Sequence, residues 1–586
     1  MKYPFLQTHS VKIVAMVALC LTACVDNDYD LAKDIDMNVQ VGGDLTFPTS
    51  NTDNYTMVQV MNLSDNSSIV PDGQKYGLNE GDYVLVQDGD ATSSSVNIPK
   101  QVVYDTECSS TTNQISVVNS DQTMNLPNLV NEIHLLDNNI DKAVRSISFA
   151  CTDIALDFKI QITSATISSG AVTLKPGFSI TFPNGWTVEP GNAAAAAYTR
   201  ANGNKIVFTA DRQVSVGSTM VLSIKITGIS LKGLATGQGL YEPGKFRLDD
   251  RIVTSGPVVF RTSAVPAGQV EQLKIALTPQ VSVANILKVT GSVDPVVNVS
   301  ESSFNIRNIP DFLFDTSNNL DVVNPQIVLT VKNTSPVDFT VSGCLTAYDD
   351  KNVAHKVYVG QPYGTDAITV RGNGESVICL SRTGSGYSGG ATAVEQVKVP
   401  NLASLIESVP KRIVLGDIDV KASTKEYTFD LGQDYYFNVD YRAIVPLAFG
   451  KDLRFTYSTQ DTGWGEDLDK YSFKEVVVSL EIENTAPLDM VPAVLALDKE
   501  GKVIDDVTAE VTGVVKAGET DKATTSQLTV TLRSNAKNIG NLDGIRFTFT
   551  ATCPEQYAGI ALNEAQRVRF TDIKVKLKGG IGVDLN

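Results

Sequence analysis

Histidine is scarce in this sequence, and its scarcity limits the catalytic chemistry that the chain can support. Among 586 residues there are three histidines: His9 near the N-terminus, and His134 and His355, which lie far apart. Histidine is the usual base of hydrolytic triads and the commonest metal ligand. The sequence also lacks a phosphate-binding glycine loop, an HExxH zinc motif and an EF-hand calcium loop. We therefore expect no enzyme, no cofactor and no metal.

Positive charge and long apolar runs are also in short supply. The chain has 48 lysines and arginines against 66 aspartates and glutamates, which gives a net charge of −18. This excess of negative charge disfavours contact with nucleic acid phosphates. Beyond the N-terminus, no apolar run approaches the roughly 20 residues that a membrane-spanning helix needs. We expect neither a nucleic-acid partner nor a transmembrane helix.

The cysteines are few and lack a recognisable metal or redox spacing. None of the five that follow Cys24 is arranged as CxxC, so the sequence indicates neither a zinc ribbon nor a thioredoxin-like site. In an oxidising compartment, Cys344 and Cys379 form a conceivable disulfide within one domain. The alternative is that these cysteines are small buried hydrophobic side chains. The five are Cys108, Cys151, Cys344, Cys379 and Cys553.

The N-terminus has the pattern of an export signal. Lys2 and Lys12 are the only charged residues before Cys24, and an apolar stretch covers residues 13–21. Basic residues, a short apolar stretch and small residues at its end are typical of a signal peptide. The segment ends in the residues Leu-Thr-Ala-Cys at positions 21–24.

This ending resembles the lipobox of bacterial lipoproteins, Leu21 to Cys24. In that family the cysteine is acylated and becomes the first mature residue, which implies a signal peptide over residues 1–23 and a membrane anchor at Cys24. More than one acyl chain on the cysteine is enough for stable attachment. The alternative is an ordinary secretory signal that is cut near Ala23.

An acidic stretch follows the cysteine at residues 25–30 (VDNDYD). Such a polar run cannot pack a core, so we expect a solvated tether over residues 24–45. It also resembles the acidic stretch that follows the lipid cysteine in surface lipoproteins of Bacteroidota. That resemblance implies a lipid-anchored protein of the outer membrane, with exposure at the cell surface and a periplasmic orientation both left open.

Short β-branched and aromatic runs dominate the rest of the chain. Gly, Asn, Asp and Pro separate them at intervals of about 8–12 residues, which predicts an all-β sandwich fold rather than alternating strands and helices. Short helices are expected at only three places. Clear strand candidates are residues 328–331, 476–480, 528–532 and 547–550, and the helix candidates are residues 125–136, which include His134, 401–408 and 536–542.

An internal repeat supports tandem domains. Residues 327–338 (IVLTVKNTSPVD) match residues 478–489 (VSLEIENTAPLD). Each copy alternates apolar and polar residues, as a strand with one buried face does, and then turns at Asn-Thr-x-Pro-x-Asp. Downstream, Asn352 and Gly501 hold corresponding hairpin positions where both tolerate a positive φ. The pattern resembles late-embryogenesis and immunoglobulin-like sandwich modules, and we predict tandem immunoglobulin-like β-sandwich domains with few short helices.

The predicted organisation follows the chain from end to end. A weak echo between residues 127–130 and 400–403 relates the first β domain to the same family. The remaining boundaries rest on turn-rich stretches between strand candidates. After the signal and the tether, we predict a β domain over residues 46–160, a β domain over 161–290, sandwich repeat A over 291–425 and sandwich repeat B over 426–586.

Aromatic residues supply the candidates for ligand binding. Trp464 is flanked by Gly463 and Gly465 in a polar stretch, so its ring is a candidate for stacking on a sugar. An aromatic cluster over residues 435–441 is a second candidate, although in a sandwich such side chains usually pack in the core. Trp186 is the other tryptophan.

Two further motifs favour a structural interpretation over a chemical one. Residues 386–390 satisfy GxSxG, but no histidine follows His355 and the surroundings are a glycine-serine loop, which argues against a nucleophile elbow. Acidic turns at residues 88–90 and 349–350 would hold calcium only if other loops converged on them. Aspartate in turns also has ordinary backbone reasons.

Three functional classes remain, and we rank them from the most to the least favoured. First is a non-catalytic, membrane-anchored lipoprotein that acts in surface display, adhesion or envelope assembly, because tandem sandwiches on a lipid tether extend reach without a pocket. Second is a glycan- or nutrient-binding surface lipoprotein that uses Trp464. A hydrolase is last. The expected partners are the membrane, through the lipid on Cys24, and a protein or a glycan.

Overall fold

The computed structural model describes most of the chain from residue 38 onward. The predicted signal peptide, the lipid-attachment residue Cys24, Trp464 and most of the helix candidate at 536–542 lie outside the described residues. The described residues are 38–41, 45–48, 54–61, 63, 67–89, 91–98, 101–103, 105–137, 142–232, 239–242, 245–261, 264–297, 299–305, 318–349, 351–363, 365–389, 393–407, 410–463, 471–534, 539, 542–578 and 581–584.

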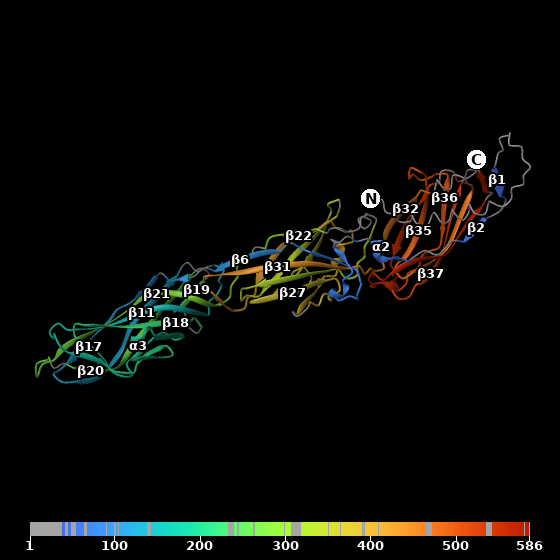
Figure 1. Cartoon of the computed structure of the whole chain (residues 1–586). Coiled ribbons are helices and arrows are strands. Elements are labelled where there is room, and N and C mark those ends of the chain that lie inside the picture. The colour runs from blue at the N-terminus through green and yellow to red at the C-terminus, as the bar shows by residue number, and fades with distance from the viewer. Residues whose placement is uncertain are drawn as a thin grey trace, which may run out of the picture.

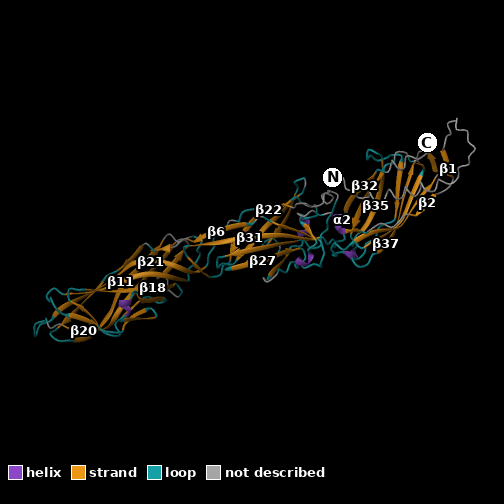
Figure 2. Ribbon diagram, viewed as in Figure 1, coloured by secondary structure: helices purple, strands orange, loops and turns teal. Residues whose placement is uncertain are grey.

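The molecule is an elongated rod built almost wholly of strands (Figures 1 and 2). Three modules follow one another along the rod, and each consists of two packed sheets. The prediction of an all-β protein with tandem sandwich domains is therefore confirmed. We call the modules the distal, middle and C-terminal modules, after their order from the left to the right of Figure 1.

The middle module shows the pattern that all three share. Its first sheet contains β27, β23 and β31 in that order, and its second contains β24, β29 and β22. Every one of these pairs is antiparallel. The six strands are β22 (Ser302–Asn305), β23 (Gln326–Asn333), β24 (Phe339–Tyr348), β27 (Gly374–Ser381), β29 (Arg412–Ala422) and β31 (Gln433–Pro446).

The C-terminal module repeats this order strand for strand. Its first sheet contains β37, β34 and β39, and its second contains β35, β38 and β32. This agreement explains the matching sequences around the two Asn-Thr-x-Pro-x-Asp turns. The strands are β32 (Phe455–Thr462), β34 (Glu475–Asn484), β35 (Asp489–Leu497), β37 (Thr524–Ser534), β38 (Gly544–Thr552) and β39 (Arg567–Lys578).

The distal module is a third copy of the same strand order. Its first sheet contains β18, β11 and β21, and its second contains β12, β20 and β10. The border predicted at residue 160 therefore falls inside a strand, because β11 continues to Thr163. The strands are β10 (Gln122–Asp137), β11 (Phe149–Thr163), β12 (Ala171–Leu174), β18 (Thr219–Ser230), β20 (Lys245–Arg261) and β21 (Glu271–Gly291).

The helix expected at residues 125–136 is wrong, because this segment lies within β10. The ladder between β10 and β20 contains a bulge between Leu126 and Leu129. The bulge puts these two buried leucines three residues apart, as in a helix, while Ile133 and Leu135 beyond it keep the two-residue spacing of a strand. By contrast, the helix candidate at residues 401–408 contains a short 3-10 helix, η3 (Leu402–Leu405).

The N-terminal segment runs along all three modules and adds edge strands to each of them. In order, β2 (Leu45–Pro48) and β3 (Tyr55–Thr56) pair with β39, β5 (Val84–Asp88) and β6 (Thr92–Ile98) pair with β31, and β7 (Gln101–Val102) and β9 (Thr111–Val117) pair with β21. The chain thus travels outward along the rod and returns module by module. The borders predicted at residues 160, 290 and 425 do not coincide with those of the sheets, because each sheet pair draws a strand from this outgoing segment.

The two ends of the described chain meet at one end of the rod. The first described strand, β1 (Asn38–Val41), pairs with the last, β40 (Ile581–Asp584), beside the C-terminal module. The distal module, which contains residues from the middle of the sequence, forms the opposite end.

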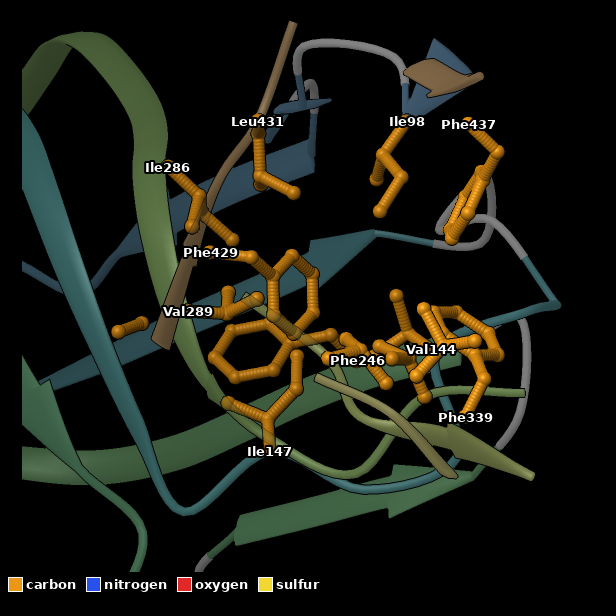
Figure 3. Close-up of a cluster of buried hydrophobic side chains, with 14 of the residues drawn as sticks. Ile98, Val144, Ile147, Phe246, Ile286, Val289, Phe339, Phe429, Leu431 and Phe437 are labelled. Carbon is orange, nitrogen blue, oxygen red and sulfur yellow. The ribbon is translucent and has the colours of Figure 1, made fainter. Parts of the chain in front are cut away.

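Apolar side chains continue from one module into the next. Figure 3 shows Val144, Ile147 and Phe246 of the distal module packed with Phe339 and Phe437 of the middle module. The Phe339 and Phe437 rings meet edge to face, with centroids 5.0 Å apart. Buried core side chains therefore form one continuous apolar cluster across the joint between the two modules.

Each Asn-Thr-x-Pro-x-Asp turn is held by a buried asparagine. The Asn333 amide donates to the carbonyl of Val337 at 2.8 Å, and the Asn484 amide donates to the carbonyl of Leu488 at 3.1 Å. Both asparagines are fully buried. The predicted hairpin positions are also confirmed, because Asn352 has φ 60° and Gly501 has φ 75°.

Three of the five cysteines, Cys344, Cys379 and Cys553, are buried as the second alternative expects, whereas Cys108 and Cys151 are partly exposed. All five that the structure describes are free, and Cys344 and Cys379 are buried on different sheets. The disulfide considered between them is absent from the structure. Burial raises the pKa of the Cys379 thiol to about 11, which keeps it protonated and unreactive at neutral pH.

A cluster of three charged side chains crosses the outer face of the C-terminal module. Glu475 on β34 accepts hydrogen bonds from Lys578 at 2.9 Å and from Arg533 at 2.8 Å. Both hydrogen bonds lower the pKa of Glu475 below its ordinary value of 4.5, and the bond from Lys578 has the larger effect. Three strands, β34, β37 and β39, are thereby joined by charge.

We expect Glu475→Gln to lower the midpoint of thermal unfolding at pH 7. A lowered carboxyl pKa stabilises the folded state above pH 4.5, and this contribution is lost as the pH falls through the folded-state pKa. The difference between the parent and the variant should therefore shrink below pH 4.5. Calorimetry from pH 3 to 8 measures it, and Glu189→Gln, at an exposed position of β14 (Trp186–Pro190) in the distal module, is the control. A pH-independent difference would contradict the assignment.

Candidate functional site

The two site residues predicted from sequence, Cys24 and Trp464, are not placed by the structure because both lie outside the described residues. Within the described part of the chain, no helix is long and apolar enough to span a membrane. The same part contains no cluster of three or more His, Cys, Asp or Glu side chains arranged to hold a metal ion.

The other sequence candidates serve structural roles. His134 lies on β10, where its Nδ1 is 2.8 Å from a carboxylate oxygen of Asp249 in a half-exposed pair. Residues 386–389 of the GxSxG segment follow β27, and the next element that the structure describes is a strand, β28 (Val394–Lys398). Trp186 is buried and stacks on Phe182.

The aromatic cluster on β31 divides between core and surface. Phe437 and Tyr441 are buried, whereas Tyr436 is exposed. The Tyr435 hydroxyl donates to the carbonyl of Asp430 and accepts from its amide. These four side chains therefore do not form one ligand-binding face, and core packing explains most of the cluster.

The middle module contains a small apolar cavity. It has a volume of about 20 Å³ and is lined by Leu85, Ile327, Leu405 and Val445, among others. A ligand pocket usually measures about 300–1,000 Å³, whereas this space would hold about one water molecule. The cavity is a packing defect where the edge strand β5 meets the module.

The free end of the distal module is the candidate functional surface, and we call it the tip. β21 pairs through residues 288–291 with β30 (Tyr427–Asp430), which lies between β29 and β31 of the middle module in the chain, so the other end of β21 points away from the rest of the rod. Figure 1 shows this end at the far left, beside β17 (Arg212–Ser215). Four loops form it, at residues 118–121, 164–170, 216–218 and 264–270.

The tip loops carry little charge, although the whole chain carries −18, and at their border the Glu271 carboxylate accepts a hydrogen bond from the Thr166 hydroxyl. The four loops consist mainly of Ser, Thr, Ala, Gly and Val, and Asp121 is their only charged residue. Val270 is 61% exposed. Loops of small, mostly uncharged side chains lower the cost of removing water from ions when a partner approaches closely.

The tip loops are fixed by their own hydrogen bonds. The Ser164 hydroxyl accepts from the amide of Ile167 at 3.1 Å and donates to the carbonyl of Gln272. The Ser218 hydroxyl donates to the carbonyl of Ser215 at 2.7 Å. The amide of Gln269 donates to the carbonyl of Pro266, which closes a turn. A surface ordered in advance loses less conformational entropy on binding.

The tip differs from the same end of the other two modules. In the middle module this end contributes the buried Phe339 to the joint with the distal module. In the C-terminal module it contributes Ala486 and Leu488 to the apolar cluster that continues into the middle module. In the distal module, Ile167 and Val265 are already buried under the tip loops. The distal module is thus a capped end, as the terminal unit of a repeat array must be.

Comparison with known proteins adds little. No family model matches the chain, and no curated protein matches it. One similar crystal structure is of a protein from Parabacteroides distasonis ATCC 8503 that is described as a candidate secreted protein. The two share 17% identity over 50% of this chain and 83% of that protein, with a TM-score of 0.33. This likeness is too slight to support a functional argument.

Sequence reasoning missed the tip because its signal is a local absence of charge. Residues 164–170 (SATISSG) and 264–270 (AVPAGQV) look like ordinary turns when each is considered alone. The two loops become one surface only when β11, β12, β20 and β21 are known to belong to the same pair of sheets.

Proposed function

We propose that this protein is a non-catalytic lipoprotein that stands on the outer membrane as a stiff rod and presents its distal tip to an extracellular partner. The observation that carries the proposal is the pairing of β1 with β40 at one end of the rod. Cys24 precedes β1 by a short tether, so a lipid at this position attaches the rod by that end. The tip then lies at the greatest distance from the membrane.

The joints support the same proposal. Apolar side chains bridge the distal and middle modules, and one continuous cluster reaches from the distal module to Ala486 and Leu488 of the C-terminal module. A rod with packed joints holds the tip away from the surface better than modules joined by flexible linkers. The outgoing segment adds hydrogen bonds to every module along the way.

Replacement of the lipid cysteine tests the anchor. We expect Cys24→Ser to release the protein from the membrane fraction, because no other lipid site is proposed. Cys108→Ser, which alters a free cysteine inside the fold, is the control and should fractionate like the parent. Membrane fractionation followed by immunoblotting measures the outcome. A membrane-bound Cys24→Ser protein would contradict the anchor.

Epitope insertion tests the orientation. One short epitope is placed between Gly268 and Gln269 in the tip, and another between Glu500 and Gly501 in the hairpin after β35 (Asp489–Leu497), at the opposite end. On intact cells, antibody should label the tip epitope at least as strongly as the hairpin epitope. If neither epitope is labelled until the outer membrane is permeabilised, the rod faces the periplasm and surface display is wrong.

A further inference from the structure

The middle module carries an exposed pair of stacked tyrosines. Tyr358 lies on β25 (Ala354–Val359), and Tyr363 lies in the loop that follows. Their ring centroids are 4.9 Å apart and their planes are inclined by 30°. Tyr358 is 40% exposed and Tyr363 is 48% exposed. Among the side chains that the structure describes, Tyr436 is the only other exposed aromatic one.

The local sequence is built to hold this pair. Gly360 has φ +79°, and a Cβ at this position would lie 2.4 Å from the carbonyl oxygen of Val341. Only glycine therefore permits the turn that brings the chain back beside β25. The amide of Tyr363 donates to the carbonyl of Gly360 at 3.0 Å, which closes the turn.

Hydrogen bonds within the loop fix it further. The amide of Gly360 donates to the Thr365 hydroxyl at 2.6 Å, and the Gln361 side-chain amide donates to the carbonyl of Thr365 at 2.7 Å. These bonds tie residues 360 and 361 to Thr365, so that Tyr363 is held beside Tyr358 of the edge strand β25. Aromatic side chains that serve only packing are normally placed in the core, as Phe339 and Phe437 are.

Polar groups accompany the rings. Lys356 is exposed and lies two residues before Tyr358, so both side chains are on the same face of β25. Lys356 has no ion-pair partner among the described residues. The platform therefore offers apolar ring faces with phenol hydroxyls at their edges and one unpaired ammonium nearby.

We propose that Tyr358 and Tyr363 form a binding platform for a pyranose ring of a glycan. The C–H face of a pyranose is apolar and flat, and it suits an exposed tyrosine ring, while its hydroxyls need donors and acceptors at the ring edge. Lys356 supplies donors for a hydroxyl or for a uronate carboxylate. This function is separate from the anchor and from the tip.

Affinity electrophoresis of the full mature chain tests the platform. The probes are starch, galactomannan, xylan and polygalacturonate, each set in a native gel. We expect at least one of them to retard the parent protein. Tyr358→Ala and Tyr363→Ala should each weaken that binding about tenfold, as the loss of an aromatic stacking partner predicts. Tyr436→Ala, which removes an exposed tyrosine elsewhere, should leave binding unchanged.

A second variant separates ligand contact from loss of the fold. Tyr363→Phe keeps the stacked ring and should keep binding within about threefold, because only one hydroxyl is lost. Circular dichroism of all variants checks that the module is folded. Failure of every polysaccharide to retard the parent would overturn the proposal. So would equal binding by the parent and a folded Tyr358→Ala protein, or binding of a proline-rich peptide in place of any glycan.

Discussion

Asn484→Ala is expected to destabilise the C-terminal module by about 3 kcal/mol, the range for buried polar groups that lose their partners. The Asn484 amide donates to the carbonyls of Leu488 at 3.1 Å and of Lys516 at 2.9 Å, and its oxygen accepts from the amide of Ala486 at 2.8 Å. Alanine removes all of these bonds while the backbone groups stay buried. Hydrogen exchange measured by mass spectrometry should show faster exchange in β34 and β37.

The repeat supplies an internal replicate of this experiment. Asn333 makes two of these bonds in the middle module, to the carbonyl of Val337 and from the amide of Ser335, so Asn333→Ala should accelerate exchange in β23 and β27 instead. Asn202→Ala, at an exposed position of the distal module, is the control and should change stability by less than about 0.5 kcal/mol. Similar exchange in the parent and in both turn variants would show that these asparagines do not hold their turns.

Gly291→Ala is expected to cost about 3 kcal/mol and to loosen the joint between the distal and middle modules. A Cβ on Gly291 would lie 1.8 Å from the carbonyl oxygen of Ser146, and backbone cannot yield as a flexible side chain does. Gly291 also pairs at this point with Tyr427 of β30, the strand that leads from β29 to β31 of the middle module. Limited proteolysis should cut the variant near the joint much faster than the parent.

The control for this substitution is Gly374→Ala. The nearest atom to a Cβ on Gly374 is 3.9 Å away, so the added methyl group meets no obstacle. We expect its proteolysis pattern and its midpoint of urea unfolding to match those of the parent. Equal susceptibility of the Gly291→Ala and Gly374→Ala proteins would mean that the joint tolerates the displacement of Ser146.

The sequence predicted the class of fold and its repeat, because both depend on local patterns. Alternation at residues 327–332 and 478–483 identifies two strands, and the shared Asn and Pro residues identify the turn after each of them. Asn352 and Gly501 show their backbone requirement in the same way. Such signals lie within a dozen residues of each other.

The sequence alone does not indicate which strands belong to which module. β2 and β39 are far apart in the sequence but pair in the fold, and nothing in residues 45–48 (LTFP) specifies a partner near the C-terminus. The third module was also hidden, because the distal turn at residues 164–170 lacks the Asn-Thr-x-Pro-x-Asp pattern. Its loops cap the rod and do not contact another module, so their amino-acid composition differs from that of the turns at the joints.

The candidate sites also divide into those that local sequence indicates and those that only the fold reveals. The residues next to Cys24 and Trp464 in the sequence mark both as candidate sites, and both lie outside the described residues. Tyr358 and Tyr363 attract no attention in the sequence, because a tyrosine on a strand is usually half-buried. Their importance depends on Gly360, whose turn brings the second ring onto the first.

The out-and-back path of the chain also has a consequence for biogenesis. A chain that is exported N-terminus first delivers β2, β6 and β9 long before their partners. β9 waits for β21, β6 for β31, and β2 for β39 near the end of translocation. Because closing a longer loop is slower, we expect the distal module to be completed first and the C-terminal module last. The edge strand β2 would then stay unpaired the longest, which makes that interval the one when the new chain most needs a chaperone.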